Sequence, residues 1–78
     1  MTQEDKLNLL VEIESQLRPV VSRKELSWAL GGLLVPRSIA NLDSAGKGPS
    51  GKIKIGRTVG YTKKSVMEWL SVRLSATI

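Results

Sequence analysis

The sequence predicts a mainly α-helical domain with a small β-hairpin. Four segments place apolar residues at helical spacing behind a capping residue or a proline. Between the third and the fourth lies a short segment that alternates basic and apolar residues with period two, as a hairpin strand does. The 78 residues allow one domain, residues 1 to 78, with a modest core.

The composition argues against an enzyme. The chain has no cysteine, so neither disulfides nor a thiolate zinc site can stabilise it. It also has no histidine, which is the commonest general base and the commonest metal ligand. We therefore expect no catalytic residues, no metal site and no cofactor.

The chain also lacks the marks of a membrane or secreted protein. No run approaches the roughly 20 apolar residues that cross a bilayer. Glu4 and Asp5 stand where a signal peptide carries basic residues. We expect a cytoplasmic protein that makes no contact with a membrane.

Charge is unevenly distributed along the chain. Residues 1 to 22 carry two basic and four acidic side chains, a net charge of −2. Residues 23 to 78 carry ten basic and three acidic side chains, a net charge of +7. A basic body of this size attracts polyanions, and nucleic acid is the most abundant one inside a cell. The alternative is a charged surface that only keeps the protein soluble.

A first helix is predicted over residues 3 to 17, with Thr2 and Asp5 as a capping box and Pro19 after its end. Its apolar residues cover a wider arc than the ~100° stripe of a simple surface helix. These residues are Leu7, Leu9, Leu10, Val11, Ile13 and Leu17. Either all of them pack on the domain, or part of this face binds another protein or a second copy. Residues 1 to 19 form this N-terminal unit, and residues 22 to 74 form the rest of the domain.

A second helix is predicted from the capping box of Ser22 and Glu25 to Leu30, with Gly31 and Gly32 ending it. Trp28 lies on a different face from Leu26, so we expect it to pack against the N-terminal helix. Stacking of this Trp on nucleic acid is the alternative, although a single Trp is more often part of a core.

The third helix begins at Pro36 and ends at Gly46, with Ile39 and Leu42 on its inner face. Its outward residues near the first turn are Arg37, Ser38 and Asn41. Arg and Asn match the major-groove edges of guanine and adenine, respectively. Two helices joined by a glycine-containing turn are typical of a DNA-binding helix-turn-helix, so we interpret the third helix as its recognition helix.

The segment GKGPSGK that follows satisfies the pattern G-x-x-x-x-G-K of a phosphate-binding loop. Ile53 replaces the Ser or Thr that would hold magnesium, and the loop leads from a helix to a strand instead of the reverse. We interpret it as a flexible turn whose Lys47 and Lys52 can contact phosphates.

The hairpin can be paired in two ways. A three-residue loop pairs Ile55 with Val59 and keeps apolar residues on one face, and we favour this register. A two-residue turn of Gly56 and Arg57 mixes the faces, although glycine at its first position suits such a turn. In either register Arg57 lies at the tip, and we expect Lys52 and Lys54 on the outer face.

Thr62 caps the last predicted helix, whose inward residues follow helical spacing. They are Val66, Trp69, Leu70 and Leu74. Lys63 and Lys64 lie in its first turn, where positive charge opposes the helix dipole. We interpret these two lysines as phosphate-binding residues; the alternative is that they are simply solvated.

Residues 22 to 74 resemble the excisionase-like winged helix-turn-helix domains, which are related to the DNA-binding domains of the MerR family. The segments that carry the resemblance are SRKELSWAL, PRSIANL and KIKIGRTVGYTKKSVMEWL. It implies a small, nucleoid-associated protein of a bacterial phage or mobile element that binds double-stranded DNA. Such proteins direct recombination toward excision, with an integrase as partner, or regulate transcription. The alternative is a protein-interaction module that uses the apolar N-terminal helix.

The resemblance places Arg37, Ser38 and Asn41 at the major groove. It also makes the hairpin with Lys52 and Lys54 a wing, whose tip at Arg57 approaches the minor groove. Asn41 and Leu42 stand where these domains commonly have a basic residue followed by Trp, and the turn between the two helices is longer than usual.

Overall fold

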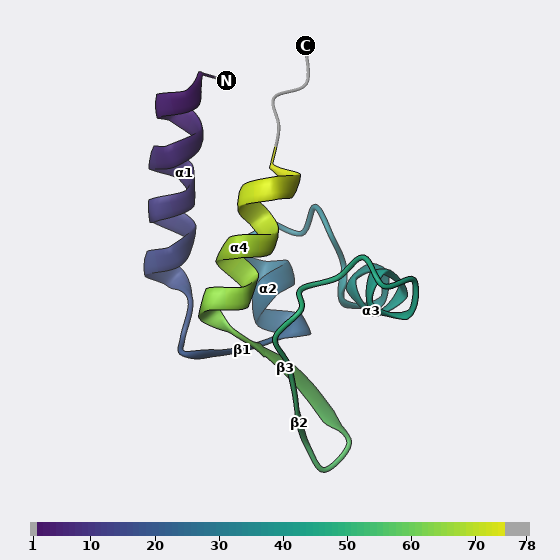
Figure 1. The fold of residues 1–78 in the computed structure, drawn as a ribbon. Helices are drawn as coiled ribbons and strands as arrows, with labels where there is room; N and C mark the ends of the chain where they lie inside the picture. Colours follow the sequence, from purple (N-terminus) through teal and green to yellow (C-terminus); the bar gives the residue numbers. More distant parts are fainter. Residues whose placement is uncertain (1, 75–78) are drawn as a thin grey trace.

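The computed structural model describes residues 2–74, which form four helices and a three-stranded antiparallel sheet (Figure 1). The predicted mainly helical fold class is confirmed. The elements in chain order are α1 (Gln3–Gln16), β1 (Val20–Ser22), α2 (Arg23–Ala29), α3 (Pro36–Ser44), β2 (Lys52–Ile55), β3 (Thr58–Thr62) and α4 (Lys63–Arg73). None of these helices is long and apolar enough to span a membrane.

The helix ends follow the predicted caps. Thr2 and Asp5 form the capping box of α1, and Ser22 and Thr62 cap α2 and α4 by accepting a backbone N–H three residues on. Gly31 takes a φ of +65° after α2, and the Gly32 N–H donates to the Ser27 carbonyl at 2.8 Å. This is the hydrogen bond of a Schellman motif, and it ends α2 where the two glycines predicted an end.

Strand β1 adds an edge to the hairpin that the sequence did not predict. The strand order is β1–β3–β2, with Val21 opposite Tyr61 and Ser22 opposite Gly60. A Cβ at Gly60 would lie 3.1 Å from the Val21 carbonyl oxygen, so glycine permits this close pairing. Three residues directly before a helix cap are too few to show a period of two.

The predicted three-residue hairpin loop was wrong. Ile55 pairs with Thr58, so the turn consists of two residues, Gly56 and Arg57. Gly56 has a φ of +61°, and no residue other than glycine has a positive φ within residues 2–74. A positive φ at the first turn position alone is the requirement of a type II′ hairpin turn.

This register moves the lysines to the other face of the sheet. Lys52 lies opposite Tyr61 and Lys54 opposite Val59, so both lysines share a face with the strand residues that reach the core. The expectation that they lie on the outer face was wrong. The outer face instead carries Ile55, which is 76% exposed.

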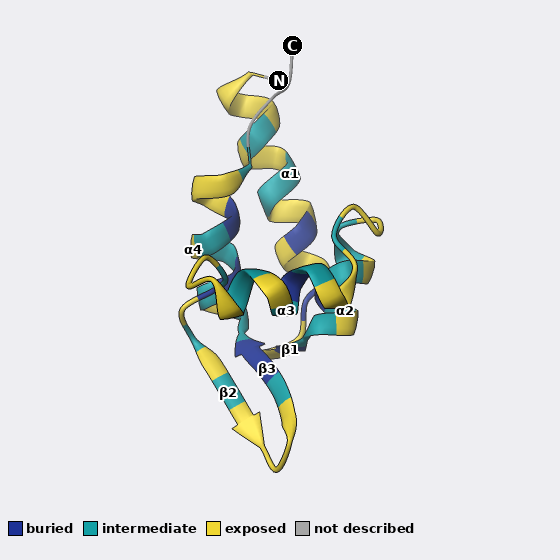
Figure 2. Ribbon diagram, turned by 90° about the vertical axis from the view of Figure 1, so that its right-hand side faces the viewer, coloured by how far each residue is buried: buried dark blue, intermediate teal, exposed yellow. Residues whose placement is uncertain are grey.

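The core draws on α1, the sheet and the three other helices (Figure 2). Its buried apolar side chains are Ile13, Leu17, Val21, Leu26, Ile39, Tyr61, Val66 and Leu70. Helix α1 lies beside α4 (Figure 1) and contributes Ile13 to this core, and Leu17 at its C-cap contributes a second side chain. The N-terminal helix is therefore part of the domain.

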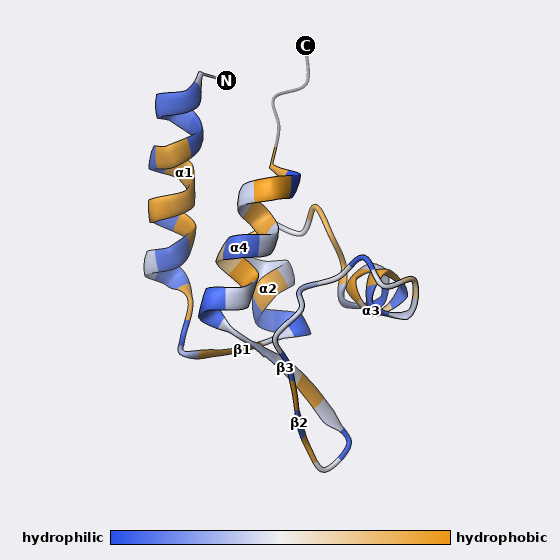
Figure 3. Cartoon of the chain, viewed as in Figure 1, coloured by the Kyte–Doolittle hydropathy of each residue, from blue (hydrophilic) through white to orange (hydrophobic). Residues whose placement is uncertain are grey.

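Apolar side chains on both α1 and α2 remain at the surface, and the middle of α1 is hydrophobic between hydrophilic ends (Figure 3). Leu7 and Val11 of α1 are 52% and 65% exposed. Trp28 is 69% exposed, so the expectation that it packs as a core residue against α1 was wrong. The core-facing position of α2 belongs to Leu26, and a residue two positions further points roughly 200° away around the helix.

Candidate nucleic-acid interface

Helix α3 presents two of its predicted base-reading residues to solvent. Arg37 and Asn41 are exposed and lie one turn apart, whereas Ser38 is half-buried. Ile39 is fully buried and fixes the opposite side of the helix in the core. Val35 offers no side-chain cap, but Pro36 occupies the first turn and the helix begins there as predicted.

A partly buried polar network holds α3 against the rest of the domain. The Arg23 guanidinium donates to the Asp43 carboxylate at 2.7 Å and to the Tyr61 hydroxyl at 3.0 Å. The Tyr61 hydroxyl donates to the same carboxylate oxygen. Arg23 belongs to α2, Asp43 to α3 and Tyr61 to β3, so one network fixes α3 relative to both the preceding helix and the sheet.

The negative charge of this network has a positive charge beside it. The Asp43 side chain is only 6% exposed, and the ion pair with Arg23 supplies its counter-charge. The hydrogen bond to Asp43 raises the pKa of Arg23. Burial, followed by the hydrogen bond to Asp43, raises the pKa of Tyr61 above its usual 10.0, so the hydroxyl stays protonated and donates.

Sequence reasoning missed this network. The available signal was Asp43 itself, an acidic residue in the last turn of a helix, where negative charge is unfavourable beside the dipole. An acid in that position needs a nearby cation, but the sequence does not say which of the ten basic residues after position 22 provides it.

The hairpin projects from the body below α3 in Figure 2. The bond from Tyr61 to Asp43 places α3 on the Tyr61 face of the sheet, and Lys52 and Lys54 project from that same face. Both lysines are exposed, as is Arg57 at the tip. The corrected register therefore brings the basic residues of the hairpin to the same side as α3.

The loop between α3 and β2 is held by several hydrogen bonds. The Lys47 carbonyl accepts from the Trp69 indole at 2.8 Å and from the Arg73 guanidinium at 2.9 Å. The Gly51 carbonyl accepts from the Thr62 N–H at 3.2 Å. These bonds tie the backbone of the loop to α4 at Lys47 and to the end of β3 at Gly51. The Lys47 side chain is exposed beside the end of α3.

The two lysines of α4 lie elsewhere. Lys64 is exposed and Lys63 is half-buried, and the Lys63 N–H donates to the Pro19 carbonyl at 3.0 Å. The first turn of α4 is thus next to the connection between α1 and β1, away from α3 (Figure 1). The structure brings α3 and the hairpin together, but it does not add Lys63 and Lys64 to the same surface.

Comparisons with family models, with curated proteins and with solved structures find no match for this chain.

The surface formed by α3 and the hairpin offers hydrogen-bond donors and positive charge from two directions. Its exposed basic residues are Arg37, Lys47, Lys52, Lys54 and Arg57. The nearby acid, Asp43, is neutralised by Arg23, so it does not repel an anion at this surface.

Proposed function

We propose that the protein binds double-stranded DNA as a winged helix-turn-helix domain. In this proposal α2 and α3 are the two helices of the motif, and β2 and β3 form the wing. The observation that carries the proposal is the placement of Lys52 and Lys54 on the same face of the sheet as Tyr61, whose hydroxyl donates to Asp43 of α3. A helix that enters the major groove and a basic hairpin beside it can then follow one duplex.

The residues of this surface have different roles in the proposal. Arg37 and Asn41, with Ser38 at their side, contact base edges. Arg57 reaches the minor groove, where an Arg responds to groove width as well as charge. The remaining lysines contact phosphates, and Lys63 and Lys64 do so outside the groove that α3 enters. The phosphate-contacting set is Lys47, Lys52, Lys54, Lys63 and Lys64.

The biological role follows from the resemblance of residues 22 to 74. We propose a nucleoid-associated protein of the cytoplasm that acts as an excisionase, with an integrase as partner, or as a small transcription regulator. Recombination assays with and without an integrase encoded nearby distinguish these roles. Excision that depends on the protein supports the first role, and repression of a reporter promoter without recombination supports the second.

DNA binding is tested by its dependence on salt. Contacts to about four to six phosphates predict that log K falls with log salt with a slope of roughly −4 to −5. Fluorescence anisotropy of a labelled duplex, titrated at several salt concentrations, measures this slope. A change in affinity of less than about twofold between ~50 and ~200 mM salt would contradict the proposal. Lys6→Ala, on the acidic α1, is the control that leaves the slope unchanged.

A second candidate function is a protein-interaction module, because Leu7 and Val11 stay exposed on α1. An apolar contact of this kind is nearly independent of salt, unlike binding to phosphates. The salt titration therefore separates the two functions.

A further inference from the structure

Helix α1 carries an exposed apolar stripe with an acid at each end. Leu7 and Val11 are one turn apart, and Glu4 and Glu14 continue the same face at spacings of three residues. We call these four residues the acidic ridge. Within residues 2–74 neither Glu4 nor Glu14 has an ion-pair partner, so both carboxylates are available to an outside cation.

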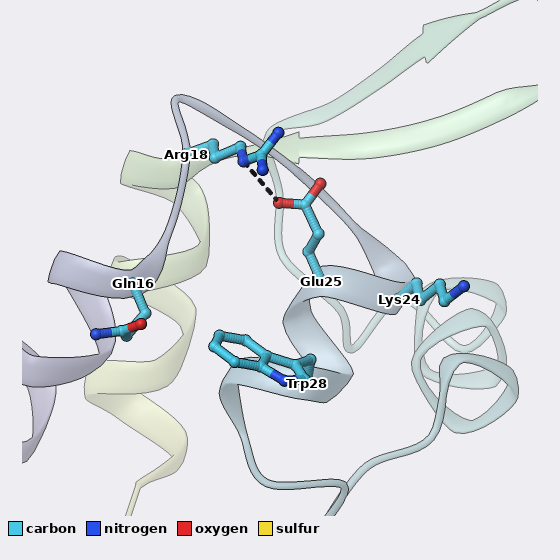
Figure 4. A pocket seen from close by; sticks show the side chains of 5 residues that line it. All are labelled: Gln16, Arg18, Lys24, Glu25 and Trp28. Atoms are coloured by element: carbon cyan, nitrogen blue, oxygen red, sulfur yellow. Dashed lines mark ion pairs between the residues drawn. The ribbon is translucent and has the colours of Figure 1, made fainter.

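A hollow of complementary character lies between the end of α1 and α2. It has a volume of about 500 Å³, and the exposed ring of Trp28 forms part of its wall (Figure 4). Arg18 and Lys24 lie at its border, and Glu25 pairs with Arg18 at 3.9 Å. We call it the Trp28 hollow. Its two cations outnumber its one acid, so an aromatic surface lies beside a net positive charge, as a partner of the acidic ridge requires.

The ridge and the hollow lie on opposite sides of α1. Gln16 borders the hollow and also lines the groove between α1 and Ala29 of α2. At about 100° per residue, Leu7 lies roughly 180° around the helix from Gln16. One molecule therefore cannot bring its own ridge into its own hollow, and two molecules cannot exchange both contacts in a closed dimer.

Charge argues against pairing of two ridges. An antiparallel pair of α1 helices that sets Leu7 on Val11 of the second copy also sets Glu4 beside Glu14, and a parallel pair sets each Glu beside itself. Like charges at these positions repel. The occupant that fits the ridge is therefore basic and apolar, which describes the Trp28 hollow.

We propose that the acidic ridge of one copy docks into the Trp28 hollow of a second copy. Leu7 and Val11 cover the indole, and Glu4 and Glu14 face Arg18 and Lys24. Because each contact joins two different surfaces on opposite sides of α1, the assembly is head-to-tail, and it either grows as an open chain or closes into a ring of more than two copies. The contact uses no residue of α3 or the hairpin, so chain formation does not depend on the proposed DNA binding.

Sedimentation equilibrium of the free protein tests the contact. A few side chains bury far less than the ~1,600 Å² of a typical stable complex, so we expect association at protein concentrations of roughly 0.1 to 1 mM. Val11→Glu damages only the ridge, and Trp28→Ala damages only the hollow. Each variant alone should remain monomeric. An equimolar mixture should form a one-to-one dimer and no longer chain, because one intact ridge and one intact hollow remain.

Val72→Ser is the matched control, since Val72 is exposed on α4 outside both surfaces and its loss should leave association unchanged. Far-ultraviolet circular dichroism checks that every variant is folded. A mixture that stays monomeric would overturn the proposal. So would a wild-type protein that stays monomeric over the whole range, or one that stops at a closed dimer.

Discussion

Asp43 ties α3 to α2 and β3 because it accepts hydrogen bonds from both Arg23 and Tyr61. Removing a buried carboxylate leaves two donors without their acceptor, and each unsatisfied group costs free energy. The partly exposed Arg23 can recover some of this cost from water. Loss of this one network therefore affects α2, α3 and β3 at once.

We predict that Asp43→Ala lowers the free energy of unfolding by about 2 to 3 kcal/mol. Asp43→Asn keeps an acceptor but loses the charge, so about 1 to 2 kcal/mol is expected. Urea unfolding followed by circular dichroism measures both values. Glu68→Ala, on the exposed side of α4, is the control and should change stability by less than about 0.5 kcal/mol. Equal values for Asp43→Ala and Glu68→Ala would contradict a structural role of the network.

Tyr61 makes stability sensitive to alkaline pH. Its pKa is raised in the folded state, chiefly by burial, so the folded protein binds the phenolic proton more tightly than the unfolded chain does. The stability that this provides is complete below about pH 10 and is lost as the pH rises through the raised pKa.

The measurement is the difference in melting temperature between the wild type and Tyr61→Phe, followed from about pH 8 to about pH 11. The wild type should lose more stability than the variant above about pH 10, since the lysines titrate in both proteins. Tyr61 is the only tyrosine, so tyrosinate absorbance reports its ionisation directly. An ionisation at or below pH 10.0 in the folded protein would refute the raised pKa.

At the scale of elements, capping residues predicted the helices well. Ser22 and Thr62 mark starts that the structure confirms, because a cap is a local interaction between residues three apart. Pro36 marks the start of α3 through its fixed φ and not through a cap. β1 could not be predicted, because it depends on the pairing of Val21 with Tyr61, which is distant in sequence. The hairpin register follows from the local turn at Gly56, not from alternation of apolar residues.

Part of the candidate site could be predicted from the sequence, namely the residues whose positions depend only on their own helix. The outward positions of Arg37 and Asn41 follow from the helix period and the buried Ile39. The face of Lys52 and Lys54 required the strand register, and the separation of Lys63 and Lys64 from α3 required the whole fold. The prediction that Trp28 packs against α1 was wrong because the exposure of Trp28 depends on which residues of α1 pack against α2.

Mutations in α3 should change the sequence preference of DNA binding, whereas mutations in the hairpin should change its overall affinity. We predict that Arg37→Ala or Asn41→Ala costs about 1 to 3 kcal/mol on a preferred duplex and much less on a scrambled one, because these side chains contact bases. Lys54→Ala should weaken binding to both duplexes similarly and reduce the salt slope by about one.

A preferred duplex can be obtained by selection from a random library. Competition binding against a scrambled duplex at two salt concentrations then compares the variants. If Arg37→Ala and Asn41→Ala leave the ratio of the two affinities unchanged, α3 does not read the sequence, and another element must do so.

At the scale of the whole molecule, the acidic N-terminal helix and the basic body fold as one unit. The N-terminal part has a net negative charge, and the rest of the chain has a net positive charge. Ile13 and Leu17 of α1 are buried in the same core as Val66 and Leu70 of α4. The residues proposed to bind DNA lie outside α1. Stability and DNA binding should therefore be separable by mutations in this helix.

Ile13→Ala and Val11→Ala make a matched pair on α1, since both remove apolar atoms but only Ile13 is buried. We predict that Ile13→Ala lowers the free energy of unfolding by about 2 to 4 kcal/mol, a large part of the stability of a small domain. Val11→Ala should cost less than about 0.5 kcal/mol. Urea unfolding measures both.

At temperatures where each variant is folded, both should bind duplex DNA with the wild-type salt slope, because neither changes the basic surface. A loss of salt-dependent binding in folded Ile13→Ala would mean that α1 positions the DNA-binding surface as well as stabilising the core.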